Sequence, residues 1–407
     1  MKKILRNLFI FIIIIIFIVA FSNSYSSLSM DNLAYVLALG IDTSTNNKLK
    51  VTFQFSTTAS ISESGSSKKS PPVVNTVEAS SLSNAINLMN SYMGKQLNMS
   101  HCKIIIFSEE FAKQGISSEI YTLINDTQVR PSANIVVAKC DSSYYIENTK
   151  PELESLISKY YEILTNSSKY TGYMPNATIG DFFNGLLCKT CEPYAILGGI
   201  SNETSQNPST IDSQKDYTLK ANESSIEGDT NSENMGVAIF KEDQLVGELN
   251  ALETICFLSL RDELDNFLIS VPDPNNAESY IDIFLTPDGS VSSKIDTSTG
   301  SPYIKVKAKF TGKIYSMSDN SNYLDTSVLE DISKSCDSYL ESMFSNYLYR
   351  TSKEFKSDIN SFGKNSLSNF LTTHKFDNYN WLKNYKDAFF DVQVDTSVKS
   401  GMLLTEI

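Results

Sequence analysis

Apolar and polar positions in the first part of the chain follow the spacing of strands. The run "LAYVLALGID" is almost continuously apolar and "LKVTFQFST" alternates with period two, while the polar stretch "TSTNNK" separates them. Period-two alternation is typical of a half-buried strand, and a short polar stretch between two such runs predicts a hairpin. The next stretch, Ser62–Pro72, has nothing apolar to bury and predicts a flexible loop.

Helical and strand-like patterns alternate after this loop. "SSLSNAINLMNSYMG" has helical spacing and a closing Gly94, "KIIIF" predicts a short buried strand, and "SEEFAKQG" begins with a serine cap and two acids. "NIVVAK" predicts another strand, and "PELESLISKYYEIL" predicts a helix that opens at Pro151. Alternating strands and helices predict an α/β domain with a mixed sheet over residues 25–200.

A polar stretch separates this region from a second pattern. Residues 201–234 have little that can pack, and we interpret them as a linker or a long loop. Beyond it, "GVAIFKEDQLVGEL" predicts two strands around a turn, and "YIDIFLTPDGSVSSKID", "YIKVKAKFTGKIY" and "FFDVQVDTSVKSG" alternate as strands. Thr326 or Ser327 caps a long amphipathic helix that has Cys336 on its apolar stripe. Residues 235–407 are therefore predicted to form an α+β domain, an antiparallel sheet packed against a long helix.

The N-terminus is a separate unit. "MKKILRNLFIFIIIIIFIVAF" has a basic start and then 14 apolar residues, Leu8 to Phe21. A helix of that length spans about 21 Å, short of the roughly 30 Å of a bilayer core. Residues 1–24 therefore predict a secretory signal peptide or an uncleaved signal anchor, and both interpretations stay open. Either places the remainder of the chain on the outer side of a membrane.

The charge balance narrows the classes of partner. The 407-residue chain has 34 Lys and Arg against 47 Asp and Glu, a net charge of -13. Nucleic-acid binding needs a basic surface, so this balance argues against it. It also argues against a purely electrostatic attachment to an anionic bilayer. Attachment to a membrane would then need apolar contact or a covalent lipid.

Side chains that could carry chemistry are few. The chain has two histidines and six cysteines, and His101 stands directly before Cys102. A metal site or a nucleophile–base pair would need further ligands or an orienting acid, which the neighbouring sequence lacks. We expect Cys102 at the edge of the strand "KIIIF" and His101 hydrogen-bonded to backbone at its start. His374 lies in a polar stretch, and we expect it to be an exposed loop residue.

The remaining candidates also favour structural roles. Cys188 and Cys191 in "CKTC" could form a local disulfide, but we favour two buried free thiols. The acidic pairs Glu109–Glu110 and Asp262–Glu263 are of the kind that usually caps or solvates helices. The motifs of hydrolase elbows, zinc helices and phosphate-binding loops do not occur in the sequence. We therefore expect no catalytic, cofactor-binding or metal-binding residues, and no enzyme.

Several segments, in order, are similar to one known family. They are "MDNLAYVLALGID", "LNMSHCKIIIFSEEFAKQGI", "DTQVRPSANIVVAK", "GVAIFKEDQLVGEL" with "ETICFLSL", and "SDINSFGK", Trp381 and "DVQVDTSVKSG". Together they resemble the Ger(x)C family, the third subunit of nutrient germinant receptors in spore-forming bacteria. Each segment is short, and their order along nearly the whole mature chain makes the resemblance specific.

One feature departs from that family. Its members are usually lipoproteins with a cysteine directly after the signal, whereas "SNSYSSLS" at Ser22–Ser29 contains none. A diacylglyceryl group cannot be attached without that thiol. The resemblance then implies that the apolar segment anchors the protein, or that partners alone hold it at the membrane. A single helix is a stronger anchor than one acyl chain.

The resemblance implies a function without catalysis. It implies an extracytoplasmic subunit on the outer face of the spore inner membrane, which works in receptor assembly or signal relay. Its partners would be two integral-membrane subunits, one of them similar to an amino-acid transporter. The alternatives are a stand-alone solute-binding protein and, less favoured, a secreted hydrolase. The long polar stretch and the lack of two repeated α/β halves speak against the solute-binding protein.

Overall fold

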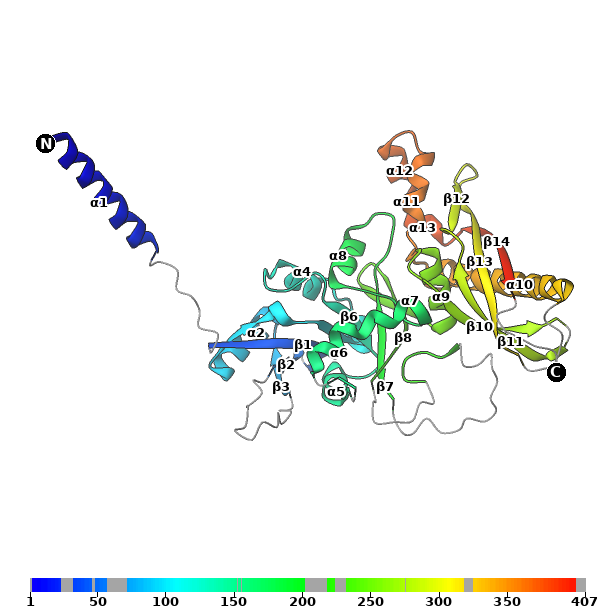
Figure 1. The fold of residues 1–407 in the computed structure, drawn as a ribbon, viewed down its shortest axis with the longest axis horizontal. Helices are drawn as coiled ribbons and strands as arrows, with labels where there is room; N and C mark the ends of the chain where they lie inside the picture. Colours follow the sequence, from blue (N-terminus) through cyan, green and yellow to red (C-terminus); the bar gives the residue numbers. More distant parts are fainter. Residues whose placement is uncertain are drawn as a thin grey trace.

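The fold is that of a computed structural model of the chain. The structure describes residues 2–22, 32–45, 48–56, 72–151, 153–154, 156–201, 218–223, 232–274, 276–317 and 325–399. Helix α1 (Lys2–Ser22) precedes two β-sheets that lie beside each other, the first blue to green and the second yellow to red in Figure 1. Within the described part of the chain, no helix has both the length and the apolar character needed to cross a membrane.

The first sheet is mixed and has nine strands in the order β3-β2-β1-β5-β6-β7-β8-β9, with β4 paired to β1. Strands β1, β5, β6 and β7 are parallel, and antiparallel strands extend both sides of this centre. The sequence analysis predicted this mixed sheet, and the β1–β2 hairpin is confirmed. The strands are β1 (Leu33–Thr43), β2 (Leu49–Phe55), β3 (Val73–Ala79), β4 (Gln96–Asn98), β5 (Ile104–Ser108), β6 (Asn134–Ala138), β7 (Tyr194–Ile200), β8 (Ser232–Lys241) and β9 (Gln244–Leu249).

Helices cover both faces of this sheet. Helix α5 contacts β1 at Gly40, where an added Cβ would lie 2.5 Å from Ser142 Oγ. On the opposite face α2 packs over β3, since Asn75 Nδ2 donates a hydrogen bond to Met93 Sδ at 3.2 Å. The helices are α2 (Leu82–Met93), α3 (Glu109–Ala112), α4 (Ser117–Asn125), α5 (Ser142–Asn148), α6 (Ile157–Ile163), α7 (Ser168–Thr171), α8 (Ile179–Leu187) and α9 (Ala251–Leu260).

Helix boundaries follow the capping signals where these exist. Helix α2 ends at Gly94, which has a left-handed φ of 60°, and the Ser108 hydroxyl accepts a hydrogen bond from Phe111 N–H at the start of α3, as predicted. The prediction that a helix opens at Pro151 is wrong, because α6 begins at Ile157. Leu153 is 100% exposed and Leu156 63% exposed, so this stretch buries none of the apolar side chains that a packed helix needs.

The polar stretch of residues 201–234 connects neighbouring strands of one sheet. Strand β7 pairs with β8, and β8 pairs with β9. The sequence analysis assigned β8 and β9 to the second domain, but in the structure they belong to the first sheet. Lengthening a connecting loop costs little extra entropy, so a long connection does not prevent this pairing. The expectation that little of the stretch packs is wrong for residues 218–223. Ala221 is 0% exposed and its N–H donates to Met235 O at 2.9 Å. The predicted loop over Ser62–Pro72 lies, apart from Pro72, outside the described residues.

The second sheet packs against the long helix α10, as predicted. Its strands are antiparallel except β14, which runs parallel to β13. The chain between these strands includes α10 and three short helices, a crossover long enough for a parallel return. The elements are β10 (Phe267–Asp273), β11 (Asn276–Pro287), β12 (Ser292–Asp296), β13 (Tyr303–Met317), α10 (Thr326–Tyr349), α11 (Phe362–Ser366), α12 (Thr373–Tyr379), α13 (Trp381–Tyr385) and β14 (Phe389–Lys399).

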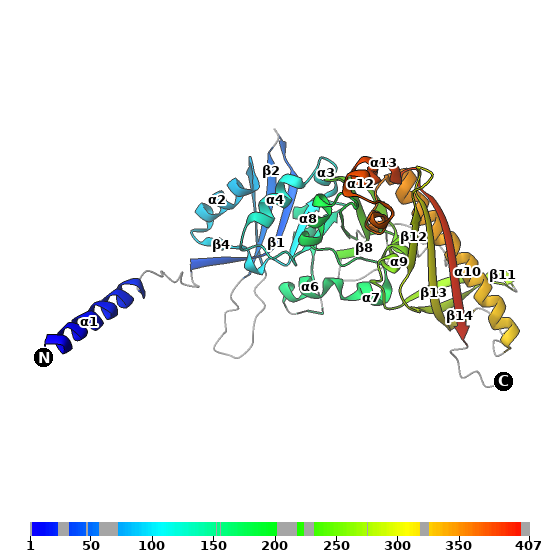
Figure 2. The same cartoon turned by 90° about the horizontal axis from the view of Figure 1, so that it is seen from above.

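Two details of α10 differ from the sequence pattern. Asp325 is its N-cap and accepts a hydrogen bond from Ser327 N–H, so the cap precedes the predicted Thr326 or Ser327. The helix continues into a π-helical turn, Arg350–Phe355, that ends at Lys356 with a φ of 55°. Cys336 is 0% exposed in the interface with the sheet, which confirms the predicted packed thiol. Figure 2 shows α10 running alongside β14, to which it is hydrogen-bonded.

Candidate functional site

His101 and Cys102 do not form a reactive pair. Cys102 is 1% exposed, and its thiol contacts Ile104 O at 3.5 Å. Burial raises the pKa of this thiol to about 12, so it is not a nucleophile near neutral pH. His101 ends a 3₁₀ turn, is exposed, and packs its ring edge-on against Tyr35 at 4.9 Å between centroids. Among the described residues this contact replaces the predicted hydrogen bond to backbone.

The expectation for "CKTC" is wrong, because Cys188 and Cys191 form a disulfide. Their Cα atoms are 5.4 Å apart. Helix α8 ends at Cys188, whose extended backbone turns the chain so that Cys191 approaches it. The spacing of the two cysteines in the sequence allows this disulfide. Burial of the apolar face of α8 fixes the turn after the helix, and this turn brings the two thiols together.

The disulfide loop leads to a junction between the two sheets, which we define by Thr190, Glu192, Asp358, Gly363 and Trp381. Glu192 is 6% exposed. Its backbone N–H donates to the Asp358 carbonyl at 3.1 Å, and its carboxylate accepts from Glu242 N–H at 2.7 Å. Burial is the main cause that raises the pKa of Glu192 to about 7. This carboxyl group is therefore partly protonated near neutral pH.

Asp358 is the centre of the junction and is 0% exposed. Its carboxylate accepts hydrogen bonds from Trp381 Nε1–H at 2.7 Å, Gly363 N–H at 2.9 Å and Phe362 N–H at 3.1 Å. Burial raises the pKa of Asp358 to about 6, although these three donors act in the opposite direction. The carboxylate thus fixes the start of α11 and the single tryptophan in one arrangement.

Gly363 lets the two regions approach closely. A Cβ atom there would lie 2.5 Å from Thr190 O and 2.5 Å from Trp381 Cδ1, so no larger side chain fits without movement of the backbone. This explains why "SDINSFGK" and Trp381 belong together: the first segment supplies the carboxylate and the glycine, and the indole closes over both. The sequence pattern marked these segments and gave no sign that they meet the disulfide loop.

A second set of contacts joins α10 to α9. Arg350 Nη1 lies 2.5 Å from Glu253 Oε1 and 2.6 Å from Oε2. Glu253 also completes a capping box with Asn250 at the start of α9. Ser357 Oγ donates to Phe240 O on β8 at 2.7 Å. Together with the junction, these contacts hold both sheets around one connected apolar core.

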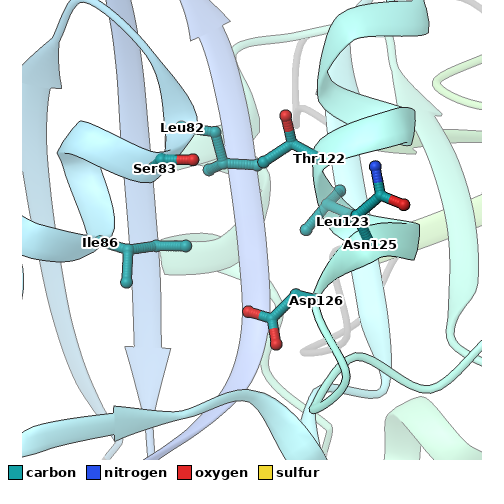
Figure 3. Close-up of a pocket in the computed structure, with 7 residues that line it drawn as sticks. All are labelled: Leu82, Ser83, Ile86, Thr122, Leu123, Asn125 and Asp126. Carbon is teal, nitrogen blue, oxygen red and sulfur yellow. The ribbon is translucent and has the colours of Figure 1, made fainter.

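Two hollows open on the surface. One has a volume of about 490 Å³ between α2 and α4 (Figure 3), where it is lined by Leu82, Ser83, Ile86, Thr122, Leu123, Asn125 and Asp126. Its lining includes the apolar Leu82, Ile86 and Leu123 and the carboxylate of Asp126. Another hollow of about 340 Å³ surrounds Arg261, whose Nε lies 2.8 Å from Glu263 Oε1. Both hollows are open to solvent.

Of the two acidic pairs, Glu109–Glu110 lies at a helix start, as predicted, whereas Asp262–Glu263 contacts a loop and an arginine. Asp262 Oδ1 accepts a hydrogen bond from Val291 N–H at 2.9 Å, and Glu263 pairs with Arg261. Glu109 and Glu110 occupy the first turn of α3. His374 is exposed, as predicted, but lies in α12 instead of a loop. Within the described ranges, no cluster of three or more His, Cys, Asp or Glu is arranged to hold a metal ion.

Comparison with known proteins identifies the class. Residues 26–198 match the model described as "Spore germination protein N-terminal domain", and residues 235–401 match "Spore germination B3/GerAC like, C-terminal". The chain therefore belongs to the Ger(x)C family of spore germination proteins, and it is a germinant-receptor subunit of that type.

Particular relatives support this assignment. The chain is 23% identical over 389 residues to spore germination protein KC of Bacillus subtilis (strain 168), covering 91% of this chain and 90% of that protein. The fold is similar to that in the crystal structure of the GerBC protein, with a TM-score of 0.53 and 14% identity. That similarity covers 88% of this chain and 96% of the GerBC chain, and it shows a shared fold.

Proposed function

We propose that this chain is a non-enzymatic, extracytoplasmic subunit of a nutrient germinant receptor, needed for receptor assembly or for relay of the germination signal. It lies on the outer face of the spore inner membrane and docks on two integral-membrane subunits, one of them transporter-like. The nutrient binds in a membrane partner, and this subunit does no chemistry on it.

The observation that carries this proposal is the junction around Asp358. It joins the two regions that match the family models through a buried carboxylate, a glycine without space for a side chain, and the indole of Trp381. A subunit that passes a mechanical signal between partners needs such a coupling, because force is lost where two regions rotate freely. The extensive core shared by the two sheets supports the same role.

The buried cysteine also supports a role without catalysis. The Cys102 thiol, which stood out in the sequence, is buried with a pKa of about 12 and lies beside an exposed histidine that packs on a tyrosine. A nucleophile needs a lowered pKa or an adjacent base in hydrogen-bond contact. This geometry is that of a packed side chain and does not favour catalysis.

Deletion in the native spore tests the function. We expect spores without this chain to lose germination in response to the nutrient of their receptor, and the membrane subunits to fall in abundance when assembly is the affected step. Germination by a route that bypasses receptors is the control and should be unchanged. Nutrient germination at the normal rate in the deletion strain would overturn the proposal. Tight binding of an amino acid by the purified chain alone would support a solute-binding protein instead.

A further inference from the structure

Strand β3 forms the outer edge of the first sheet. It pairs with β2 over its full length, Val73 with Phe55 through Ala79 with Leu49, without a register shift. Every second residue of an edge strand directs its N–H and C=O away from the sheet. Within the described residues, no group of this chain hydrogen-bonds to the outward backbone of β3. Among the residues that the structure describes, this edge therefore has a row of donors and acceptors without a partner.

The sequence of β3 does not protect this edge. Residues 73–77, "VVNTV", are uncharged and mostly β-branched, which favours a further strand. Natural sheets usually protect an exposed edge with an interior proline, an inward charge, a bulge or a covering helix. The two prolines, Pro71 and Pro72, stand before the strand, and Glu78 is the single charged residue within it. Such an edge tends to self-associate unless a partner covers it.

Helix α2 adds apolar side chains beside the same edge. Leu82, Ala85 and Met89 face the sheet, and Ile86 lines the hollow toward α4. At about 100° per residue, Leu88 and Tyr92 lie about 200° and about 240° around the helix from Ile86. They therefore lie on the flank away from α4, and β3 is the edge strand on that side of the sheet.

The exposure of these side chains is high for their type. Tyr92 is 76% exposed and Leu88 is 43% exposed, and Val73 on β3 is 41% exposed. The Asn75 side chain reaches Met93 Sδ at 3.2 Å, which fixes α2 above this edge. A free backbone edge and an adjacent apolar flank are the two parts of a strand-addition site: the backbone supplies hydrogen bonds and alternate side chains meet the flank.

We propose that an extended segment of another receptor subunit adds to β3 as a tenth strand of the first sheet and packs apolar side chains against Leu88 and Tyr92. This proposal rests on the proposed function, since it assigns the surface by which the chain assembles. The segment carries apolar residues at alternate positions on its α2 side. On its other side a basic residue suits exposed Glu78. A second copy of this chain is the less suitable occupant, because each chain carries a net charge of -13.

Crosslinking identifies the occupant. A photo-crosslinking amino acid replaces Tyr92 in the tagged full chain, expressed in spores, and mass analysis of the membrane fraction reads the crosslinked peptide. We expect a peptide from an extended segment of another receptor subunit. A crosslink to a second copy of this chain, or to residues 57–71 of the same chain, would overturn the proposal.

Charge substitutions test the apolar flank. The double variant Leu88→Glu/Tyr92→Glu should reduce recovery of the receptor subunits with the tagged chain by about tenfold or more, because charged groups would be buried against the added strand. Tyr170→Glu is the matched control, since Tyr170 is 57% exposed on α7. Both variants should unfold at the temperature of the unsubstituted protein. Equal recovery of the subunits with all three proteins would refute the surface.

Hydrogen exchange separates this inference from the proposed function. Peptides covering β3 should exchange rapidly in the purified chain and become protected in the solubilised receptor complex. A complex that forms without protection of β3 refutes the docking surface and leaves the proposed function standing. Failure to recover any receptor subunit with the unsubstituted chain refutes the proposed function itself.

Discussion

Strands β3 and β14 each lie at an edge of their sheet. Side chains of α10 hydrogen-bond to the outward backbone of β14, whereas no described group does so for β3. Along β14 the backbone N–H groups of Val394, Thr396 and Val398 donate to Glu341, Asp337 and Ser333 of α10, at 3.1, 2.7 and 3.1 Å. Four helical residues advance about 6 Å and two strand residues about 6.6 Å, so side chains four apart on the helix stay level with alternate strand residues. Strand β3 has no such row among the described residues.

The contrast between the covered β14 edge and the uncovered β3 edge suggests why β3 is open. The chain closes β14 with a helix whose polar residues repeat at the required spacing, and it closes the junction with buried carboxylates. This fold can therefore protect an edge strand. Leaving β3 open in the same molecule indicates a site kept for another chain, since open edges carry a risk of aggregation.

The largest expected effect comes from opening β14. In the triple variant Ser333→Ala/Asp337→Ala/Glu341→Ala, three strand N–H groups lose their acceptors. We expect the free energy of unfolding to fall by about 4 kcal/mol, from about 1 to 1.5 kcal/mol for each hydrogen bond. The variant should also self-associate through its second sheet. Denaturant titration and light scattering measure both effects.

The matched control for this variant uses the exposed face of the same helix. Glu330→Ala/Ser338→Ala/Ser342→Ala replaces one acidic residue and two serines at exposed positions of α10, so it carries a similar gain in helix propensity. It should change the free energy of unfolding by less than about 0.5 kcal/mol. Equal losses in the two triple variants would show that α10 does not protect the β14 edge.

A pH dependence at the junction is the next effect in size. Burial raises the folded-state pKa of Asp358 from its ordinary value of 3.8 to about 6, so the folded protein holds this proton more tightly than the unfolded chain. The contribution of Asp358 to the free energy of unfolding is full below about pH 4 and is lost as the pH rises to about 6. This loss is about 3 kcal/mol in total. Glu192, raised to about 7, acts in the same direction up to about pH 7.

Other carboxyl groups titrate in the same range, so a difference between variants isolates Asp358. The unfolding free energy of the unsubstituted protein minus that of Asp358→Asn should decrease steadily from pH 4 to pH 6. Asparagine keeps the size and one acceptor but does not titrate. A difference that is flat or rises over this range would contradict the raised pKa.

Removal of the disulfide should have a moderate effect. Cys188 and Cys191 close a loop with a sequence separation of three, so the variant Cys188→Ser/Cys191→Ser should lose about 2 kcal/mol of unfolding free energy. The loss arises mainly from the unfolded chain, and the β3 edge should keep its hydrogen-exchange rate. Cys140→Ser is the control, since this half-buried thiol is not in a disulfide. Loss of the same size in the control would indicate a general effect of thiol removal.

Much of the fold follows from the sequence because local periodicity and burial coincide. Strands β1, β2 and β5 are buried on both faces over most of their length, and their apolar runs predict them. Strand β13 and helices α2 and α10 each present one apolar face, and their spacing predicts them. Strand β3 was missed for the opposite reason. Its "VVNTVEA" does not alternate strictly, because an edge strand beside a helix is half exposed on both faces.

The junction could not be predicted from local pattern. Nothing near Asp358 in sequence shows that it meets Trp381 and Glu192, and its raised pKa depends on its burial there. Resemblance marked "SDINSFGK" and Trp381 as related, and only the tertiary structure shows that they meet. The disulfide was mispredicted for the same reason, since the closing turn depends on how α8 packs.

The smallest expected effect on stability comes from the open edge itself. Thr76→Lys places a charge in the middle of β3, where the side chain is exposed and hydrogen-bonds to Thr52 Oγ1 at 2.9 Å. We expect the free energy of unfolding to change by less than about 1 kcal/mol. Recovery of the receptor subunits should nevertheless fall severalfold, because charges at an edge oppose the addition of a strand. Thr76→Val, which also removes the hydroxyl, should keep full recovery. If the lysine variant assembled as well as the valine variant, β3 would not be the docking edge.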